Sequence, residues 1–169
     1  MSEPVHTQRV TKVRMEELYP VIREILEADS AFSLTVTGTS MVPTLLGGRD
    51  QVTIRRPDRP LGKYDLPLYR RNNGQFILHR IVSVSSDGTY TCCGDHQWKR
   101  EPGIRSEQII GVVSAFCRKG KEYSVESRSY RAWVRFWVAV LPCRRFFLLA
   151  YHGFGRLKRL LIRGRKLDT

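Results

Sequence analysis

Apolar and polar residues follow two different periods in the first third of the chain. Between Arg14 and Ala28 the apolar side chains recur at helical spacing, which predicts an amphipathic helix containing Leu18, Val21, Ile22, Ile25 and Leu26. Pro20 fits best in a first turn, so we expect this helix to begin near Tyr19. From Phe32 to Thr37 apolar and polar residues alternate strictly, which predicts a half-buried strand.

Short apolar runs separated by turn-forming residues continue to residue 116. The expected strands cover residues 51–55, 66–69, 75–85, 89–93 and 109–116. Asn72-Asn73-Gly74 and Asp87-Gly88 are hairpin signals, and Pro67 favours an edge position for its strand. Residues 97–105 are charged and are expected to form a loop. The pattern predicts a mainly β, antiparallel fold.

The character of the chain changes after Lys121. Residues 130–141 and 146–161 are rich in leucine, aromatic residues and arginine, and Pro142 lies between them. We expect two C-terminal amphipathic helices there. The predicted organisation is an N-terminal segment with one helix (residues 1–30, of which 1–12 are loosely held), a β-domain (31–120) and a basic helical tail (121–169).

Charge is concentrated in the tail. The chain has 169 residues and a net charge of +13, but residues 1–117 contain 15 basic and 13 acidic side chains, against 14 and 3 in residues 118–169. Three interpretations remain open for the tail. In the first, the tail lies on an anionic membrane surface through residues 130–166, and its aromatic side chains enter the interface: Trp133, Phe136, Trp137, Phe146 and Phe147. In the second, the tail caps the β-domain. In the third, which is the least favoured, it binds nucleic acid.

Several classes of protein are disfavoured by what the sequence contains. Cys92, Cys93, Cys117 and Cys143 have no metal-ligand spacing and are expected to be reduced; neither a metal nor a cofactor is implied. The first 30 residues lack the apolar core of a signal peptide. The best candidate for a membrane span, residues 132–151, contains three arginines and a proline. We therefore expect a cytoplasmic protein or one bound peripherally to a membrane.

One serine and one histidine carry the candidate chemistry. Ser40 lies in the turn Gly38-Thr39-Ser40-Met41-Val42-Pro43-Thr44, and His79 lies in the apolar run Leu78-His79-Arg80-Ile81-Val82. A serine hydroxyl is a weak nucleophile at neutral pH and needs a base within hydrogen-bond reach. Histidine titrates near neutrality and is the usual base. Taken alone, Ser40 is also compatible with an ordinary turn serine and His79 with a satisfied strand histidine.

Five segments in order resemble signal peptidase I-type serine peptidases, a superfamily that includes the LexA-type self-cleaving repressors. Residues 38–44 are similar to the nucleophile box G-x-S-M-x-P-T, and Pro43 favours the peptidase branch. The other matching segments are Lys63 to Arg70, Leu78 to Val82, Gly94-Asp95-His96 and Ile109 to Val113. The resemblance covers residues 30–118 and implies a LexA/signal-peptidase-like β-fold and a serine endopeptidase that cleaves a peptide or preprotein.

Histidine in place of the more common lysine base resembles the endoplasmic-reticulum, archaeal and spore-former type of signal peptidase. The resemblance implies Ser40 as nucleophile, His79 as general base, and either Asp95 or Glu101 as the acid that orients His79. Read alone, Asp95 is a turn-former and Glu101 a solvated loop residue.

The chain departs from the family pattern at three positions. Tyr64 replaces a glycine, His96 replaces an asparagine, and Gly38 replaces a hydroxyl residue that assists the oxyanion hole in some relatives. The backbone N–H of Ser40 and the side chain of Thr39 are then the expected oxyanion donors. Two other functions remain open: a non-catalytic membrane- or partner-binding module on a decayed peptidase fold, and a self-cleaving LexA-type regulator.

Overall fold

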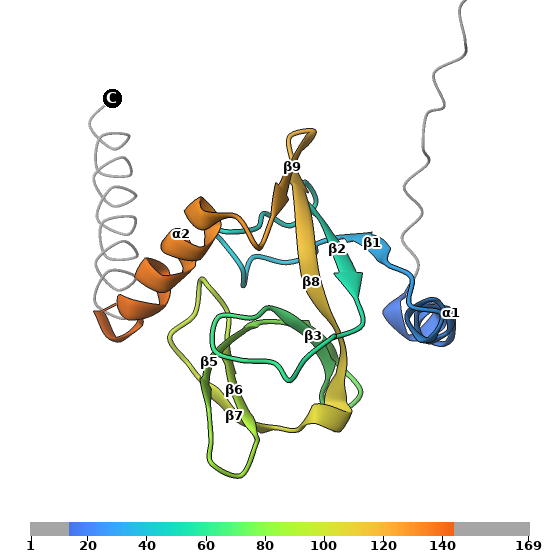
Figure 1. Cartoon of the computed structure of the whole chain (residues 1–169), viewed down its shortest axis with the longest axis horizontal. Helices are drawn as coiled ribbons and strands as arrows, with labels where there is room; N and C mark the ends of the chain where they lie inside the picture. Colours follow the sequence, from blue (N-terminus) through green and yellow to red (C-terminus); the bar gives the residue numbers. More distant parts are fainter. Residues whose placement is uncertain (1–13, 144–169) are drawn as a thin grey trace, which may run out of the picture.

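Two antiparallel sheets form the body of the protein, with helices on opposite sides (Figure 1). The computed structural model describes residues 14–143. In chain order the elements are α1 (Met15–Glu27), β1 (Phe32–Thr35), β2 (Gln51–Arg55), β3 (Pro67–Arg70), β4 (Phe76–Leu78), β5 (Arg80–Val84), β6 (Tyr90–Cys93), β7 (Glu101–Ile104), a short 3-10 helix (Ser106–Gln108), β8 (Ile109–Arg118), β9 (Lys121–Ser124) and α2 (Arg128–Ala139). The mainly β, antiparallel fold with an N-terminal helix is confirmed.

The first sheet has six strands and the second has three. The first has the order β1-β2-β8-β3-β4, and β9 also pairs with β8. The second has the order β5-β6-β7. The hairpin signals are confirmed, because Asn72-Asn73-Gly74 joins β3 to β4 and Asp87-Gly88 joins β5 to β6. The glycines of both turns have positive φ, +88° at Gly74 and +82° at Gly88, which is the conformation that such turns require.

The main core lies on one face of the six-stranded sheet. Val52 and Ile54 of β2 are fully buried there with Leu45, and Met41 packs beside them. On the other side of the molecule α2 covers the three-stranded sheet, and its Val134 and Val138 pack against Val82 and Cys93. Helix α2 therefore serves as a cap on the β-domain.

Helix α1 begins earlier than expected, at Met15 instead of Tyr19, and Pro20 lies inside it. Proline lacks the N–H that would bond to the carbonyl of Glu16 one turn earlier. Both residues are exposed, so water can satisfy that carbonyl and the helix continues. Of the predicted apolar face, Ile22 and Leu26 are buried, whereas Leu18 and Val21 are 38 % and 52 % exposed.

The edge position expected for Pro67 is wrong, because β3 lies between β8 and β4. Pro67 is the first residue of β3 and pairs with Val112 of β8. On the other side β4 ends at Leu78, opposite Leu68. The missing N–H of Pro67 therefore falls beyond the end of β4, where proline is tolerated.

Two short strands were not expected from the sequence. Residues 97–105 were predicted as a loop, but Glu101–Ile104 forms β7 against β6. Ile104 is its only buried residue, so the alternation that marks a strand is missing. Lys121–Ser124 forms β9 against the end of β8 with all four residues exposed. Neither segment carries an apolar pattern that sequence analysis detects.

The first of the two expected C-terminal helices is α2. The expected helix over residues 146–161, with Phe146 and Phe147, and the start of the chain over residues 1–12 lie outside the described residues. Within residues 14–143, no helix has both the length and the apolar character needed to cross a membrane.

Candidate active site

Ser40 lies in a tightly packed turn between β1 and β2. Gly38 has a φ of +76°, and a Cβ on Gly47 would lie 2.1 Å from the carbonyl oxygen of Gly38, so only glycine fits at Gly47. Met41 and Leu45 anchor the far side of the turn in the core, and the N–H of Leu45 donates to the carbonyl of Met41 at 2.9 Å. These contacts fix the backbone on both sides of the half-buried Ser40.

His79 lies at the point where the chain passes from one sheet to the other. The single strand expected over residues 75–85 is divided there: β4 ends at Leu78 in the six-stranded sheet, and β5 begins at Arg80 in the three-stranded sheet. Leu78 pairs with Leu68, and Arg80 pairs with Cys93. His79 is thus held between two paired residues of different sheets, and it is only 5 % exposed.

Burial lowers the pKa of His79 to about 4, from its ordinary value near 6.5. The charge of Glu101 acts in the opposite direction, and so, to a smaller extent, does that of Asp95, whereas Arg71 adds to the lowering. At neutral pH the imidazole is therefore uncharged. A neutral imidazole is the form that can accept a proton from a hydroxyl group.

Glu101 begins β7 and lies in the same open cleft as His79, a cavity of about 790 Å³. Its carboxylate accepts hydrogen bonds from the Tyr69 hydroxyl at 2.8 Å and from two guanidinium nitrogens of Arg71, each at 2.6 Å. The hydrogen bonds from Arg71 are the main reason that the pKa of Glu101 lies below its usual range. The ring of Tyr69 in turn meets the ring of His79 edge-on, with centroids 6.5 Å apart. Glu101 is thus a fixed negative charge close to the imidazole.

Asp95 is held by Arg80, the residue after His79. Nε of Arg80 donates to one carboxylate oxygen at 3.0 Å and Nη2 donates to the other at 2.7 Å. Both side chains are almost completely buried, with exposed fractions of 0 % and 2 %. The second guanidinium end of Arg80 donates to the carbonyl of Tyr64 and the hydroxyl of Tyr130, each at 3.1 Å. This ion pair joins the start of β5 to the Gly94–His96 turn.

The Ser40 turn packs directly onto the Gly94–His96 turn. The N–H of His96 donates to the carbonyl of Ser40 at 2.7 Å. A Cβ on Gly94 would lie only 2.7 Å from the same carbonyl oxygen, so this approach requires glycine. His96 also lines the cleft that contains His79. The structure thereby connects the segments of Ser40, Asp95 and His79 through a continuous series of short contacts.

The two tryptophans of α2 hold these turns from outside. Nε1 of Trp133 donates to the Thr44 hydroxyl at 3.3 Å, and Nε1 of Trp137 donates to the carbonyl of Asp95 at 3.0 Å. The two indole rings stack with centroids 5.2 Å apart. The membrane-surface interpretation of the tail put both residues in an interface, whereas these contacts agree with its alternative, in which the tail caps the β-domain. Their spacing of four residues, beside the core positions Val134 and Val138, was the available signal.

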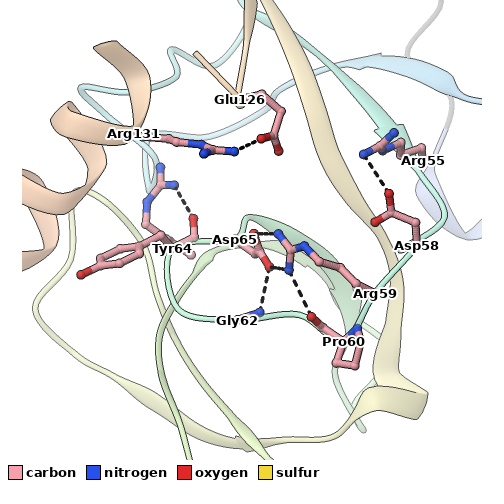
Figure 2. A network of polar contacts seen from close by, with 10 residues as sticks. Arg55, Asp58, Arg59, Pro60, Gly62, Tyr64, Asp65, Glu126 and Arg131 are labelled. Carbon is pink, nitrogen blue, oxygen red and sulfur yellow. Dashed lines mark hydrogen bonds and ion pairs between the residues drawn. The ribbon is translucent and has the colours of Figure 1, made fainter. Parts of the chain in front are cut away.

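Figure 2 shows the polar contacts around the start of the Lys63–Arg70 segment. Tyr64 has a φ of +87°, in the left-handed region that favours glycine, and its carbonyl accepts the hydrogen bond from Arg80. This explains why glycine is expected at that position. The carboxylate of Asp65 accepts two hydrogen bonds from Arg59, at 2.8 and 2.9 Å, and one from the N–H of Gly62. Asp65 is therefore a structural residue of the loop.

No protein-family model and no curated protein matches this chain.

Proposed function

We propose that this protein is a serine endopeptidase of the signal peptidase I type, which cuts a signal peptide, leader or propeptide. The observation that carries the proposal is the packing of the Ser40 turn onto the Gly94–His96 turn. A buried ion pair joins that turn to the residue after His79. A serine nucleophile needs a neutral base that rigid elements hold in a fixed relation to it, and these contacts between the two segments support that relation.

In the proposed reaction, Oγ of Ser40 attacks the scissile carbonyl carbon while the imidazole of His79 takes the hydroxyl proton. The backbone N–H of Ser40, with Thr39, stabilises the negative oxygen of the tetrahedral intermediate. The C–N bond then breaks, His79 gives its proton to the leaving amine, and an ester remains on Ser40. A water molecule hydrolyses this ester, again through His79, and the carboxyl product leaves.

Glu101 is the proposed electrostatic partner of His79. Protonation creates a positive charge at a buried position, and a nearby negative charge offsets the cost of that step. Of the two candidate acids, Glu101 raises the pKa of His79 more, and it lines the same cleft. Asp95 instead has both carboxylate oxygens bonded to Arg80, so we assign it a positioning role.

The substrate is proposed to bind as an extended strand beside Phe32–Thr37, which leads into the Ser40 turn. Within the described part of the chain, β1 pairs with β2 alone, so its other edge is available for a strand. An added strand gains affinity through main-chain hydrogen bonds, and side-chain pockets select the sequence.

A serine-directed phosphonate probe tests the proposal on the intact protein. Wild type should be labelled at Ser40, and mass spectrometry of the digested adduct locates the label. The Ser40→Ala variant should remain unlabelled, whereas Ser85→Ala, at an exposed serine in the β5–β6 hairpin, should label like wild type. Equal labelling of the wild type and of Ser40→Ala would refute the proposal. Absence of labelling in all three proteins would favour the non-catalytic module.

The site of action and the membrane contact remain predictions. We propose that the enzyme acts in the cytoplasm or peripherally at a membrane. Contact with an anionic membrane through residues 130–166 is supported in the described part by Phe136, which is 58 % exposed, and by exposed Arg131 and Arg135 on α2. Cleavage of the chain itself, as in a self-cleaving regulator, would appear as a concentration-independent loss of intact protein.

A further inference from the structure

The cleft that contains His79 carries excess positive charge at its rim. Besides His79 itself, the charged and aromatic groups around it are Arg71, His96, Trp98, Lys99, Arg100 and Glu101. Arg71 and Glu101 neutralise each other through two hydrogen bonds of 2.6 Å. Lys99 and Arg100 are both exposed, and neither forms an ion pair with a carboxylate of residues 14–143. Two positive charges therefore remain at the entrance.

These two residues, Lys99 and Arg100, form what we call the basic rim. The Cys93 sulfur lies 3.5 Å from the carbonyl oxygen of Gly94 and 3.4 Å from those of Gln97 and Lys99. Its single S–H can donate to one of them at a time, and these contacts hold the loop before the rim against the core. Glu101, immediately after the rim, begins β7 and is fixed by Tyr69 and Arg71. The rim thus lies between the loop held by Cys93 and the fixed Glu101, and it lines the same cleft as His79.

Trp98 lies beside the basic rim and is 51 % exposed. A large indole exposed at a cleft is a common anchor for peptide side chains, because it offers much apolar surface at little entropic cost. Positive side chains near such an anchor favour ligands with negative charge and speed their approach. The rim and the indole together define a surface for a peptide that is acidic and carries an apolar side chain.

We propose that the peptide cut by this protein carries an acidic residue within a few positions of the scissile bond, held by Lys99 and Arg100, with a neighbouring apolar side chain on Trp98. This inference rests on the proposed peptidase function and specifies its substrate class. The contribution is electrostatic and lies at an exposed rim, so it sets preference and weakens with salt.

A set of matched peptides measures the preference. Peptides that differ only by Asp, Asn or Lys at each position flanking the cut are compared by kcat/KM. At low salt, wild type should prefer Asp over Asn roughly 3- to 10-fold at one or more positions, on the order expected for two exposed charge pairs. The variant Lys99→Ala/Arg100→Ala should lose this preference, and Lys99→Glu/Arg100→Glu should shift it towards Lys.

The control variant is Lys119→Ala/Lys121→Ala, which removes the same charge from the exposed β8–β9 hairpin. It should keep the preference, and raising the salt concentration should reduce the preference in wild type. Equal rates for Asp and Asn peptides in wild type would overturn the inference. An equal loss of preference in the control variant would also overturn it, since net charge would then be the cause.

Binding to the Ser40→Ala variant separates this inference from the proposed function. Fluorescence polarisation with labelled Asp and Asn peptides should show tighter binding of the Asp peptide, abolished by Lys99→Ala/Arg100→Ala. Cleavage of all peptides without preference would refute the inference and leave the peptidase function intact. Selective binding without cleavage by wild type would support the basic rim and refute the peptidase function. Absence of both binding and cleavage would refute both.

Discussion

Replacing Asp95 by leucine should severely destabilise the protein, because the buried positive charge of Arg80 then has no carboxylate partner among the described residues. The guanidinium group of Arg80 is 0 % exposed, and Asp95 supplies the only carboxylate with which it forms an ion pair in the described chain. Removing one member of a buried ion pair typically costs about 3–5 kcal/mol in the free energy of unfolding. Domains of this size are stable by about 5–15 kcal/mol, so Asp95→Leu should remove a large fraction of the total.

The double variant Arg80→Met/Asp95→Leu should recover most of this loss. Two apolar side chains of similar volume often replace a buried ion pair at little cost. Arg80 also donates to the Tyr64 carbonyl and the Tyr130 hydroxyl, and losing these two bonds costs about 1 kcal/mol each. The double variant should therefore remain within about 2 kcal/mol of wild type, which makes it more stable than Asp95→Leu.

Urea denaturation followed by circular dichroism measures these free energies. The exposed pair of Arg23 and Glu27 on α1 is the matched control, and Glu27→Leu should cost less than about 1 kcal/mol. A cost below about 1 kcal/mol for Asp95→Leu would refute the view that Asp95 stabilises Arg80. A double variant whose loss of stability equals the sum of the losses of the two single variants would also refute it.

Three further predictions follow from the site. Gly94→Ala should lower kcat/KM at least tenfold, because its Cβ would displace the carbonyl of Ser40. The control is Gly62→Ala, where a Cβ meets nothing within 4 Å, and it should leave kcat/KM unchanged. Equal kcat/KM values for the two variants would contradict the close approach of Gly94 to the Ser40 carbonyl. His79 binds a proton more readily in the unfolded chain than in the native chain, so its contribution to the free energy of unfolding should increase as the pH rises from 4 to 6.5 and be lost as the pH falls through the same range. This part of the pH dependence should be missing in His79→Gln. Trp137→Phe should cost about 1 kcal/mol in urea denaturation, because one hydrogen bond is lost, and an unchanged midpoint would contradict that bond.

The sequence was informative where side chains alternate or recur on one face. The apolar spacing of α1, the alternation from Phe32 onward and the glycines of the two hairpins predicted the corresponding elements correctly. The candidate site was likewise predicted from short patterns with a specific residue order around Ser40 and His79, and that assignment stays a prediction. These signals are local, and each depends on residues within a few positions of one another.

The rest depends on contacts between distant residues, which no local pattern reveals. The apolar run around His79 gives no sign that the chain changes sheets there. The ion pair between Arg80 and Asp95 spans 15 positions, and that between Arg71 and Glu101 spans 30. The sequence therefore leaves the choice between the two acids open, and the proposal of Glu101 depends on the partners of each acid in the structure. The interpretations of the tail around Trp137 stayed open for the same reason, because its acceptor lies 42 positions away.

The most direct test of the central claim is the rate at which a serine-directed phosphonate labels Ser40 in wild type and in His79→Ala. If His79 is the base that activates Ser40, the variant should be labelled at least 100-fold more slowly at pH 7, the lower end of general-base effects. Its far-ultraviolet circular dichroism should match that of wild type. Labelling of His79→Ala at the wild-type rate would show that Ser40 reacts without this imidazole and would contradict the account.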